Sequence, residues 1–398
     1  MQNRRLLTIF LIVFVGLLGF SIILPLLPYY AETFGASPTL VGVLTASYAA
    51  AQLIGAPVLG RLSDRYGRRP ILLLSSLGTL VGFLILGFAN SLWLLFAGRI
   101  LDGLTGGNIS VAQAYIADVT DEKERAKGLG MVGAAFGLGF IIGPLLGGAL
   151  SSGGRYELPS FVAAGITLVN VLAIYFWLPE SLTEEDRKRV AKKSRKTIDP
   201  RELLEALRRP VFGPLLQTRF FYGFAWAIFT ETFSLFALYS LGLESNQTGY
   251  LLGYVGLLVV LVQGVAIGRL TARYAEHALI LSSVIVAALG LLGWAFTPNV
   301  PVLLVVLAPL ALASGVLNTV INSAITKAVP PEEVGGALGL ASALESLTRV
   351  ISPIIGGYAL EKLGNWSPGV IAAAVLAWLA IYFWRKLMVR PATVENAF

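Results

Sequence analysis

The sequence contains no cysteine, a single histidine and few charged residues. Without cysteine, neither a disulfide framework nor a thiolate nucleophile nor a cysteine-ligated zinc site can form. His277 has no second imidazole with which to bind a metal or relay a proton. There is also no H-E-x-x-H motif. These absences predict a protein that is not an enzyme and that carries no metal or other cofactor.

Charged residues make up only 13% of the 398 residues, whereas 56% are hydrophobic. Soluble domains carry about a quarter charged residues, and the mean hydropathy of this chain is +0.75. A water-soluble fold could not bury so much apolar surface. The relevant length is therefore the membrane span of about 20 apolar residues.

Apolar runs separated by short polar breaks follow one another along the whole chain. Such long, continuously apolar runs suit helices rather than the alternating strands of a barrel. We therefore predict an all-α polytopic membrane protein with twelve transmembrane helices. The first run has no cleavage site of small residues and is predicted to be a retained span. The runs cover residues 6–30, 40–59, 71–89, 92–117, 128–150 and 161–178, then 211–241, 248–270, 279–296, 302–328, 335–360 and 367–384.

The two series of six runs predict two six-helix bundles, 1–178 and 211–398 with a short tail, joined by a charged linker at 179–210. The net charge of +7 comes from basic residues in short loops beside the spans. This is the pattern of the positive-inside rule, so no nucleic-acid partner is expected. It predicts an inner-membrane protein with both termini in the cytoplasm. The Lys and Arg cluster of the linker is also suited to anionic membrane lipid.

An internal repeat supports the two halves. Residues Gly60 to Tyr66, GRLSDRY, recur as Gly268 to Tyr274, GRLTARY. The glycine and proline pattern of 143–148 returns at 352–357 at nearly the same offset. Parallel repeats half a chain apart are typical of transporters built from two similar bundles. Within 128–150, glycines at four-residue spacing predict close helix packing.

Several motifs carry a family resemblance. The segment Gly60 to Arg69, GRLSDRYGRR, resembles the signature loop of the major facilitator superfamily, and Arg99 to Gly103 resembles its Arg-x-x-polar-Gly pattern. Residues 115–125 and 139–148 resemble those of its twelve-span drug/proton antiporters, which include tetracycline/proton antiporters. The resemblance implies export of small amphipathic compounds driven by proton entry. Tetracycline exporters carry an acidic residue early in their first helix, whereas residues 6–30 contain none. Proton coupling must therefore rest elsewhere, and tetracycline itself is not the expected substrate.

The signature loop is the predicted gate. Asp64 lies near three arginines, and charge-assisted hydrogen bonds between them could hold one arrangement of the halves. The alternative is a local cap and topology anchor. The second copy has Ala272 where Asp64 stands, which favours a gate. The predicted gating residues are Gly60, Asp64, Arg65, Gly67 and Arg68.

Ionisable residues within apolar spans are costly and are functional candidates by default. Arg99 and Asp102 lie three residues apart, hence on one face. Together with Glu231 they are the predicted proton-coupling residues, the alternative for Asp102 being a static ion pair. Glu345 and Arg349, four residues apart, are predicted to form a structural pair.

Polar side chains at depth are predicted to contact the substrate, because hydrocarbon offers their amides no partners. The alternative for each is a hydrogen bond between helices. An aromatic residue near Glu231 could stack on flat or cationic ligands, although lipid-facing aromatics are common. The predicted substrate-binding residues are Gln52, Asn108, Gln113, Phe224, Glu231, Gln263, Asn318 and Asn322.

The sequence thus predicts a secondary transporter that exports small amphipathic or drug-like compounds in exchange for protons by alternating access. A facilitator or exporter of an endogenous metabolite or lipid with the same fold is the alternative.

Overall fold

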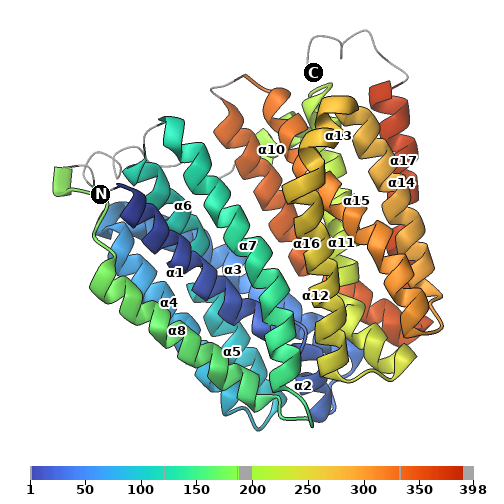
Figure 1. Cartoon of the computed structure of the whole chain (residues 1–398), viewed down its shortest axis with the longest axis horizontal. Helices are drawn as coiled ribbons and strands as arrows, with labels where there is room; N and C mark the ends of the chain where they lie inside the picture. Colours follow the sequence, from blue (N-terminus) through green and yellow to red (C-terminus); the bar gives the residue numbers. More distant parts are fainter. Residues whose placement is uncertain (1, 121, 186, 188–199, 331–332, 389–398) are drawn as a thin grey trace. The chain divides into compact units, whose positions relative to one another are not determined.

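The computed structural model describes residues 2–120, 122–185, 187, 200–330 and 333–388, and within these ranges every regular element is a helix (Figure 1). The all-helical prediction is confirmed. The chain divides into two compact units. The first contains Met1–Ala36, Val43–Arg195 and Leu243–Gly253, and the second contains Ser37–Gly42, Lys196–Gly242 and Tyr254–Phe398.

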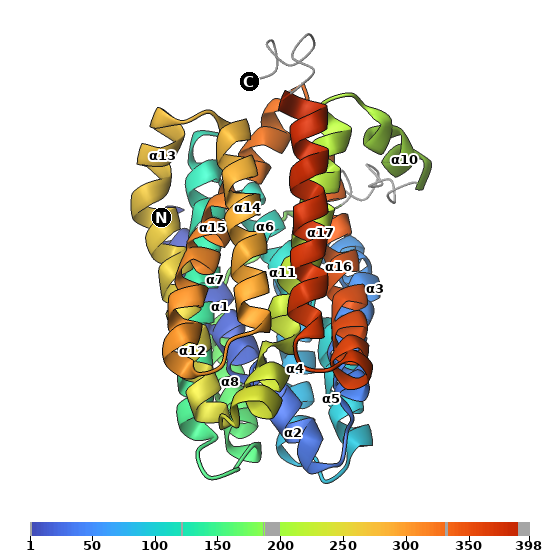
Figure 2. The ribbon, with the colours of Figure 1, turned by 90° about the vertical axis from the view of Figure 1, so that its right-hand side faces the viewer.

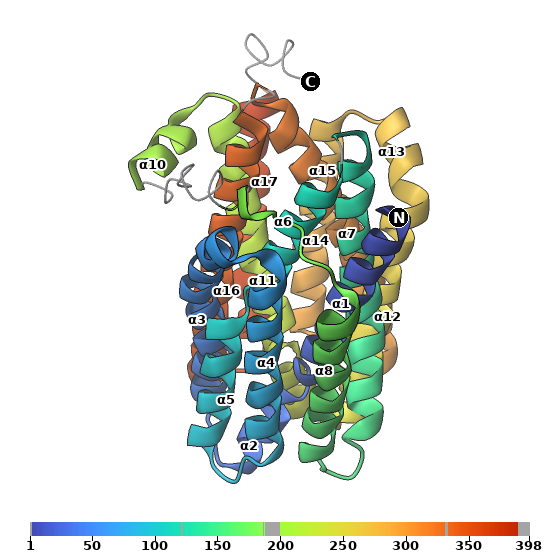
Figure 3. The ribbon, with the colours of Figure 1, turned by 90° about the vertical axis from the view of Figure 1, so that its left-hand side faces the viewer.

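The first unit is built mainly from the helices of the N-terminal half. In it α1 packs against α7 and α8, and α4 packs against α5 and α8. Helices α5, α4 and α8 lie side by side in Figure 3. Its helices are α1 (Gln2–Ile23), α2 (Leu27–Thr33), α3 (Pro38–Tyr66), α4 (Arg68–Gly87), α5 (Leu92–Thr105), α6 (Asn108–Val119), α7 (Glu122–Leu150) and α8 (Glu157–Trp177).

The second unit contains the helices of the C-terminal half. Here α11 packs against α15, α16 and α17, and α14 packs against α15 and α17 (Figure 2). Its elements are α10 (Pro200–Arg208), α11 (Phe212–Leu241), α12 (Ser245–Leu261), η1 (Val262–Ala266), α13 (Ile267–Arg273), α14 (Glu276–Ala295), α15 (Val300–Lys327), α16 (Val334–Leu363), α17 (Ser367–Phe383) and η3 (Trp384–Met388).

Two long helices, α3 and α12, are divided between the units. Each begins in one unit and continues in the other. The first residues of α12 belong to the first unit, where the Tyr29 hydroxyl donates to the Leu243 carbonyl over 3.0 Å. The first residues of α3 belong to the second unit, where the Thr39 amide donates to the Glu361 carboxylate over 3.2 Å.

Two predicted spans are interrupted. The run at 6–30 divides into α1 and α2, which meet at an angle of 41°. Pro25 lies in this break, and proline has no amide hydrogen with which to continue a helix. The run at 92–117 divides into α5 and α6 at Gly106 and Gly107, because two consecutive glycines favour departure from helical geometry. Periodicity alone predicted one continuous helix in each case.

These breaks explain the span count. Among the described residues, ten helices are long and apolar enough to cross a membrane, or eleven when α1 and α2 count as one bent span. With 14 and 12 residues, α5 and α6 are each too short to be counted, although together they fill the predicted fourth span. The arrangement is consistent with twelve spans.

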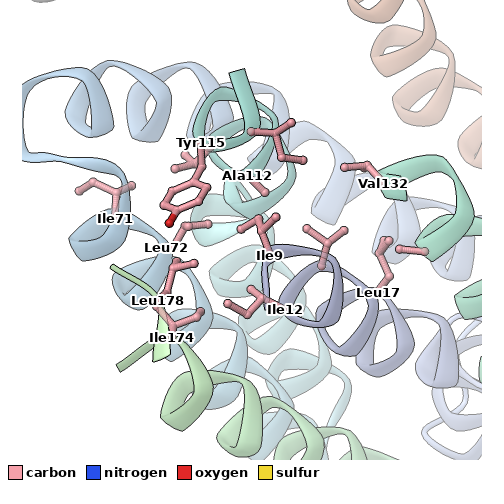
Figure 4. Packing of buried hydrophobic residues seen from close by; sticks show 14 of the residues in the cluster. Ile9, Ile12, Leu17, Ile71, Leu72, Ala112, Tyr115, Val132, Ile174 and Leu178 are labelled. Carbon is pink, nitrogen blue, oxygen red and sulfur yellow. The ribbon is translucent and has the colours of Figure 1, made fainter. Parts of the chain in front are cut away.

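The core of the first unit is a cluster of apolar side chains between α1, α4, α6, α7 and α8 (Figure 4). Ile9, Leu72 and Tyr115 are at most 1% exposed. The Tyr115 hydroxyl donates to the Pro179 carbonyl over 3.0 Å, so the aromatic ring remains in the core while its polar group is satisfied. The contact also holds the start of the linker against this unit.

The glycines of α7 allow the close approach of α1. A β-carbon at Gly143 would lie 2.6 Å from the β-carbon of Ser21, much closer than real atoms allow. The Ser21 hydroxyl crosses the same contact and donates to the Gly139 carbonyl over 2.8 Å. Small residues therefore set the distance between α1 and α7.

Gly143→Ala is expected to destabilise the protein by about 1–3 kcal/mol, because the new methyl group overpacks the contact with Ser21. Gly133→Ala on the same helix is the control, since nothing lies within 4 Å of its β-carbon position. Thermal unfolding in detergent measures both. Equal melting temperatures for the two variants would show that α7 does not depend on this close approach.

Candidate functional site

The predicted gate is an ion-pair network around Arg68, whose side chain is only 4% exposed. Its Nη1 donates to Asp64 Oδ1 over 2.5 Å and to Ser63 Oγ over 2.7 Å, while its Nε donates to Asp118 Oδ2 over 2.9 Å. Arg68 thus links the end of α3, the start of α4 and the end of α6.

Glu180, at the start of the linker, closes this network from the other side. Its carboxylate accepts from the backbone amides of Arg68 over 2.9 Å and Arg69 over 3.2 Å, which are otherwise unpaired groups at the beginning of α4. Gly67 has φ of 106°, and a β-carbon there would lie 2.8 Å from Glu180 Cδ. Only glycine fits at this position, on both backbone and steric grounds.

The network thus unites Asp64, Gly67 and Arg68 but leaves out two other residues of the predicted gate. Arg65 is exposed, with its guanidinium 5.4 Å from the centre of the Tyr66 ring. No side chain lies near the β-carbon position of Gly60, whose carbonyl accepts from Ser63 Oγ. Sequence reasoning missed Asp118 and Glu180, although both are acidic residues at the ends of apolar runs.

The second charged group is the pair on α5. Arg99 and Asp102 are 2% and 3% exposed, and Arg99 Nη1 donates to Asp102 Oδ2 over 3.3 Å. The guanidinium carbon also lies 4.0 Å from the centre of the Tyr48 ring and 5.7 Å from that of Phe20. The arginine is therefore held both by a carboxylate and by aromatic faces.

Gln52 on α3 stabilises the break beside this pair. Its Nε2 donates to the Gly106 carbonyl over 3.0 Å and to the Tyr48 hydroxyl over 3.1 Å. The side chain thus satisfies a carbonyl released where α5 ends. Asn108 Oδ1 accepts from the Ile109 amide over 2.9 Å, and Gln113 is exposed. Gln52 thus joins α3 to the end of α5, while its predicted contact with the substrate stays a prediction.

The third charged group lies in the second unit. Arg219 of α11 is 8% exposed; its Nη1 donates to Asn318 Oδ1 of α15 over 2.8 Å, and its Nη2 donates to the Glu345 carboxylate of α16. Arg349 Nη2 donates to the same carboxylate over 3.0 Å. The predicted pair of Glu345 and Arg349 is therefore part of a larger group that contains two arginines and one carboxylate.

Sequence reasoning missed Arg219, although an arginine within an apolar run is itself a signal. It lies seven residues after the start of α11, close in sequence to the basic end of the linker. The sequence alone therefore assigned Arg219 neither to the basic linker nor to the charged residues within the spans.

The aromatic residues of α11 serve mainly as packing. Phe229 and Phe233 are fully buried against Trp294 of α14, with ring centres 5.0 Å and 6.3 Å apart from it. Phe224 and Glu231 are half-buried on the same helix. Asn322 on α15 and Gln263 in the π-helical turn η1 are also half-buried.

The chain is similar to known membrane proteins along most of its length. The profile of the Major Facilitator Superfamily matches residues 9–300 and 215–397. The chain belongs to this superfamily. It is 32% identical over 91% of its length to solute carrier family 22 member 18 of Rattus norvegicus, covering 89% of that protein. It is also 30% identical over 97% of its length to the class H tetracycline resistance protein of Pasteurella multocida, covering 98% of it.

The solved structure of the nucleoside transporter NupG matches 96% of this chain and 99% of its own, with a TM-score of 0.77 and 14% identity. At this identity the match shows the fold. The resemblance to the superfamily and to tetracycline antiporters is confirmed, and the protein is a multi-pass membrane transporter rather than an enzyme.

Arg68→Gln is expected to destabilise the protein by about 3–5 kcal/mol, because it leaves the carboxylates of Asp64 and Asp118 close together without their cation. Arg65→Gln, at the exposed neighbouring arginine, is expected to cost no more than about 1 kcal/mol. Thermal unfolding of the two purified variants in detergent measures the difference. A similar loss in both would contradict a special role for the Arg68 network.

Proposed function

We propose that this transporter exports small amphipathic or drug-like compounds from the cytoplasm in exchange for protons. The observation that carries the proposal is the end-to-end similarity to a tetracycline resistance protein. In this proposal two halves, 1–178 and 211–398, alternate access around the substrate across an inner membrane. The linker at 179–210 and both termini are cytoplasmic, next to the anionic lipid surface.

Asp102 is the first candidate for the coupling carboxylate. When its carboxylate takes up a proton, the ion pair with Arg99 is lost, but the ring of Tyr48 remains 4.0 Å from the guanidinium. Cation–π attraction then compensates part of the lost charge interaction. Because Arg99 also contacts the Tyr48 ring, the Asp102 carboxylate can be protonated without leaving the buried guanidinium without any attractive partner.

Glu231 is the second candidate for proton coupling. It lies on α11, seven residues after the half-buried Phe224, whose ring could stack on a flat ligand. Phe224 and the amides of Asn318 and Asn322 lie on α11 and α15 of the same unit. We propose that they form part of the substrate site, with Gln113 and Gln263 as further polar positions.

The Arg68 network is proposed to act as the gate. Its hydrogen bonds join three helices and the start of the linker, and those from Arg68 to Ser63 and Asp64 must break for α3 to move relative to α4. Such a set of charged bonds favours one arrangement until substrate or proton binding favours another.

The second candidate function is a facilitator or exporter of an endogenous metabolite or lipid. The name of the rat relative, a solute carrier, favours this alternative because it denotes no drug resistance. The two functions differ in whether substrate binding displaces a proton.

Proton release on addition of lipophilic cations, dyes and antibiotics to solubilised protein tests this proposal. In lightly buffered detergent solution, we expect wild type to release protons when a substrate binds, and Asp102→Asn to bind the substrate without release. Loss of release in Glu231→Gln instead would assign coupling to Glu231.

Glu244→Gln, at an exposed carboxylate before α12, is the matched control and should release protons as wild type does. If substrates bind and no variant releases protons, antiport through these carboxylates is wrong. The metabolite or lipid carrier then becomes the better description.

A further inference from the structure

We infer that the second unit holds a binding site for the headgroup of an aminophospholipid, a zwitterion in which a primary ammonium group stands beside a phosphate. The site is a pocket between α13, α14, α15 and η3, in which α13 contacts both α14 and α15 (Figure 2). The pocket shares no residue with the groups proposed above for gating, proton coupling or substrate binding. The inference therefore goes beyond the proposed function and can fail independently of it.

The pocket is large enough for such a headgroup. Its volume is about 840 Å³, within the range of small-molecule sites. Ile267 of α13, Val320 of α15 and Met388 of η3 form apolar walls. Nothing among the described residues lies within 4 Å of the β-carbon position of Gly268, which also lines the pocket. The apolar walls suit the glycerol and the first methylene groups of a lipid.

Three hydroxyls that line the pocket can act there only as acceptors. The hydroxyl of Thr271 donates to a carbonyl of its own helix over 2.9 Å, and that of Thr319 does so over 3.2 Å. The hydroxyl of Ser323 donates to Glu276 Oε1 over 2.7 Å. Since a hydroxyl has one hydrogen, each of these oxygens can only accept a further hydrogen bond. This lining favours a ligand that brings several N–H donors.

An ion pair supplies the charges of the pocket. Lys327 Nζ donates to Glu276 Oε1 over 2.8 Å. Glu276 Oε2 is buried and has no hydrogen-bond partner among the described residues, so a small turn of the carboxylate would offer it to an N–H donor of a ligand. The Glu276 side chain is 12% exposed and that of Lys327 is 53% exposed.

A zwitterion complements this ion pair. Its ammonium group can lie beside Glu276 while its phosphate accepts a further N–H of the Lys327 ammonium, which has three such donors. An amine without a phosphate would instead meet Lys327 as a like charge, and a simple anion would meet Glu276 in the same way. The pair therefore favours a lipid headgroup over a soluble amine or phosphate.

The helices around the pocket are irregular in a way that is typical of functional sites. The π-helical turn η1 ends directly before Ile267, and the π-helical turn η3 supplies Leu387 and Met388. Such turns are rare and frequently lie at functional sites. The positive-inside rule predicts that this end of the unit, with Arg269 and Lys327, lies at the cytoplasmic membrane surface, where lipid headgroups are found.

The test compares lipids that differ only in the number of N–H donors on their nitrogen. Phosphatidylethanolamine, its N,N-dimethyl derivative and phosphatidylcholine carry the same charges but three, one and no such donors. Native mass spectrometry measures which lipid stays bound to protein taken from vesicles with equal amounts of all three. We expect wild type to retain phosphatidylethanolamine about tenfold more than phosphatidylcholine, as for loss of a charge-assisted hydrogen bond.

Variants locate the preference in the pocket. Gly268→Leu fills the pocket from α13 and should abolish the preference, and leucine is the better helix former at this position. Gly264→Leu is the matched control, because its β-carbon position is equally open and lies outside the pocket lining. Glu276→Gln and Thr271→Val each weaken the acceptors and should reduce the preference.

Equal retention of the three lipids by wild type overturns the inference, as does a preference that survives in Gly268→Leu. A competition experiment adds hexylamine, a soluble amphipathic amine without a phosphate. Retention of phosphatidylethanolamine supports the lipid site, whereas its displacement by hexylamine at the same concentration assigns the pocket to soluble amines and overturns the lipid inference. Proton release on substrate binding is measured separately, so the proposed export function stands or fails without this site.

Discussion

Each buried charge of this protein must be compensated inside its own helical unit, because hydrocarbon compensates none. The partners found are all specific: a carboxylate and a tyrosine ring for Arg99, two carboxylates for Arg68, and a carboxylate with an amide for Arg219. In each group the arginine side chain is no more exposed than the carboxylate that it contacts. The helices that supply partners are thereby fixed relative to one another. Gly103 of α5 allows the close approach of α3 beside the Arg99 pair, since a β-carbon there would overlap the Tyr48 carbonyl oxygen.

The internal repeat preserves an ion pair but inverts its charges. Glu276 stands 208 positions after Arg68 and Lys327 stands 209 after Asp118, and Lys327 donates to Glu276 over 2.8 Å. In the first copy Asp64 pairs with Arg68, whereas an aspartate at position 272 would meet the acid Glu276 at the equivalent position of the second copy. Ala272 is therefore expected from the inversion itself. The proposal of a gate in the first copy therefore rests on the number of helices that Arg68 joins rather than on Ala272.

The sequence predicted the helical spans, the signature loop and the pairs on α5 and α16, because all of these depend on residues close in sequence. It did not predict partners that only packing brings together. Glu180 is 112 residues from Arg68, and Arg219 is 126 residues from Glu345. The same limit applies to Gln52: its depth was evident, but its bond to the Gly106 carbonyl depends on a helix break that apolar periodicity does not reveal.

The charged groups of the two units differ in how exposed their side chains are. Arg99 and Asp102 are 2% and 3% exposed and pair with each other, which is why the proposed function assigns this pair a proton rather than a solute. In the Arg219 group the arginine side chain is 9% exposed, whereas those of Glu345 and Arg349 are 32% and 47% exposed. The superfamily fold is common to many transporters, whereas this difference depends on the side chains of α5, α11 and α16.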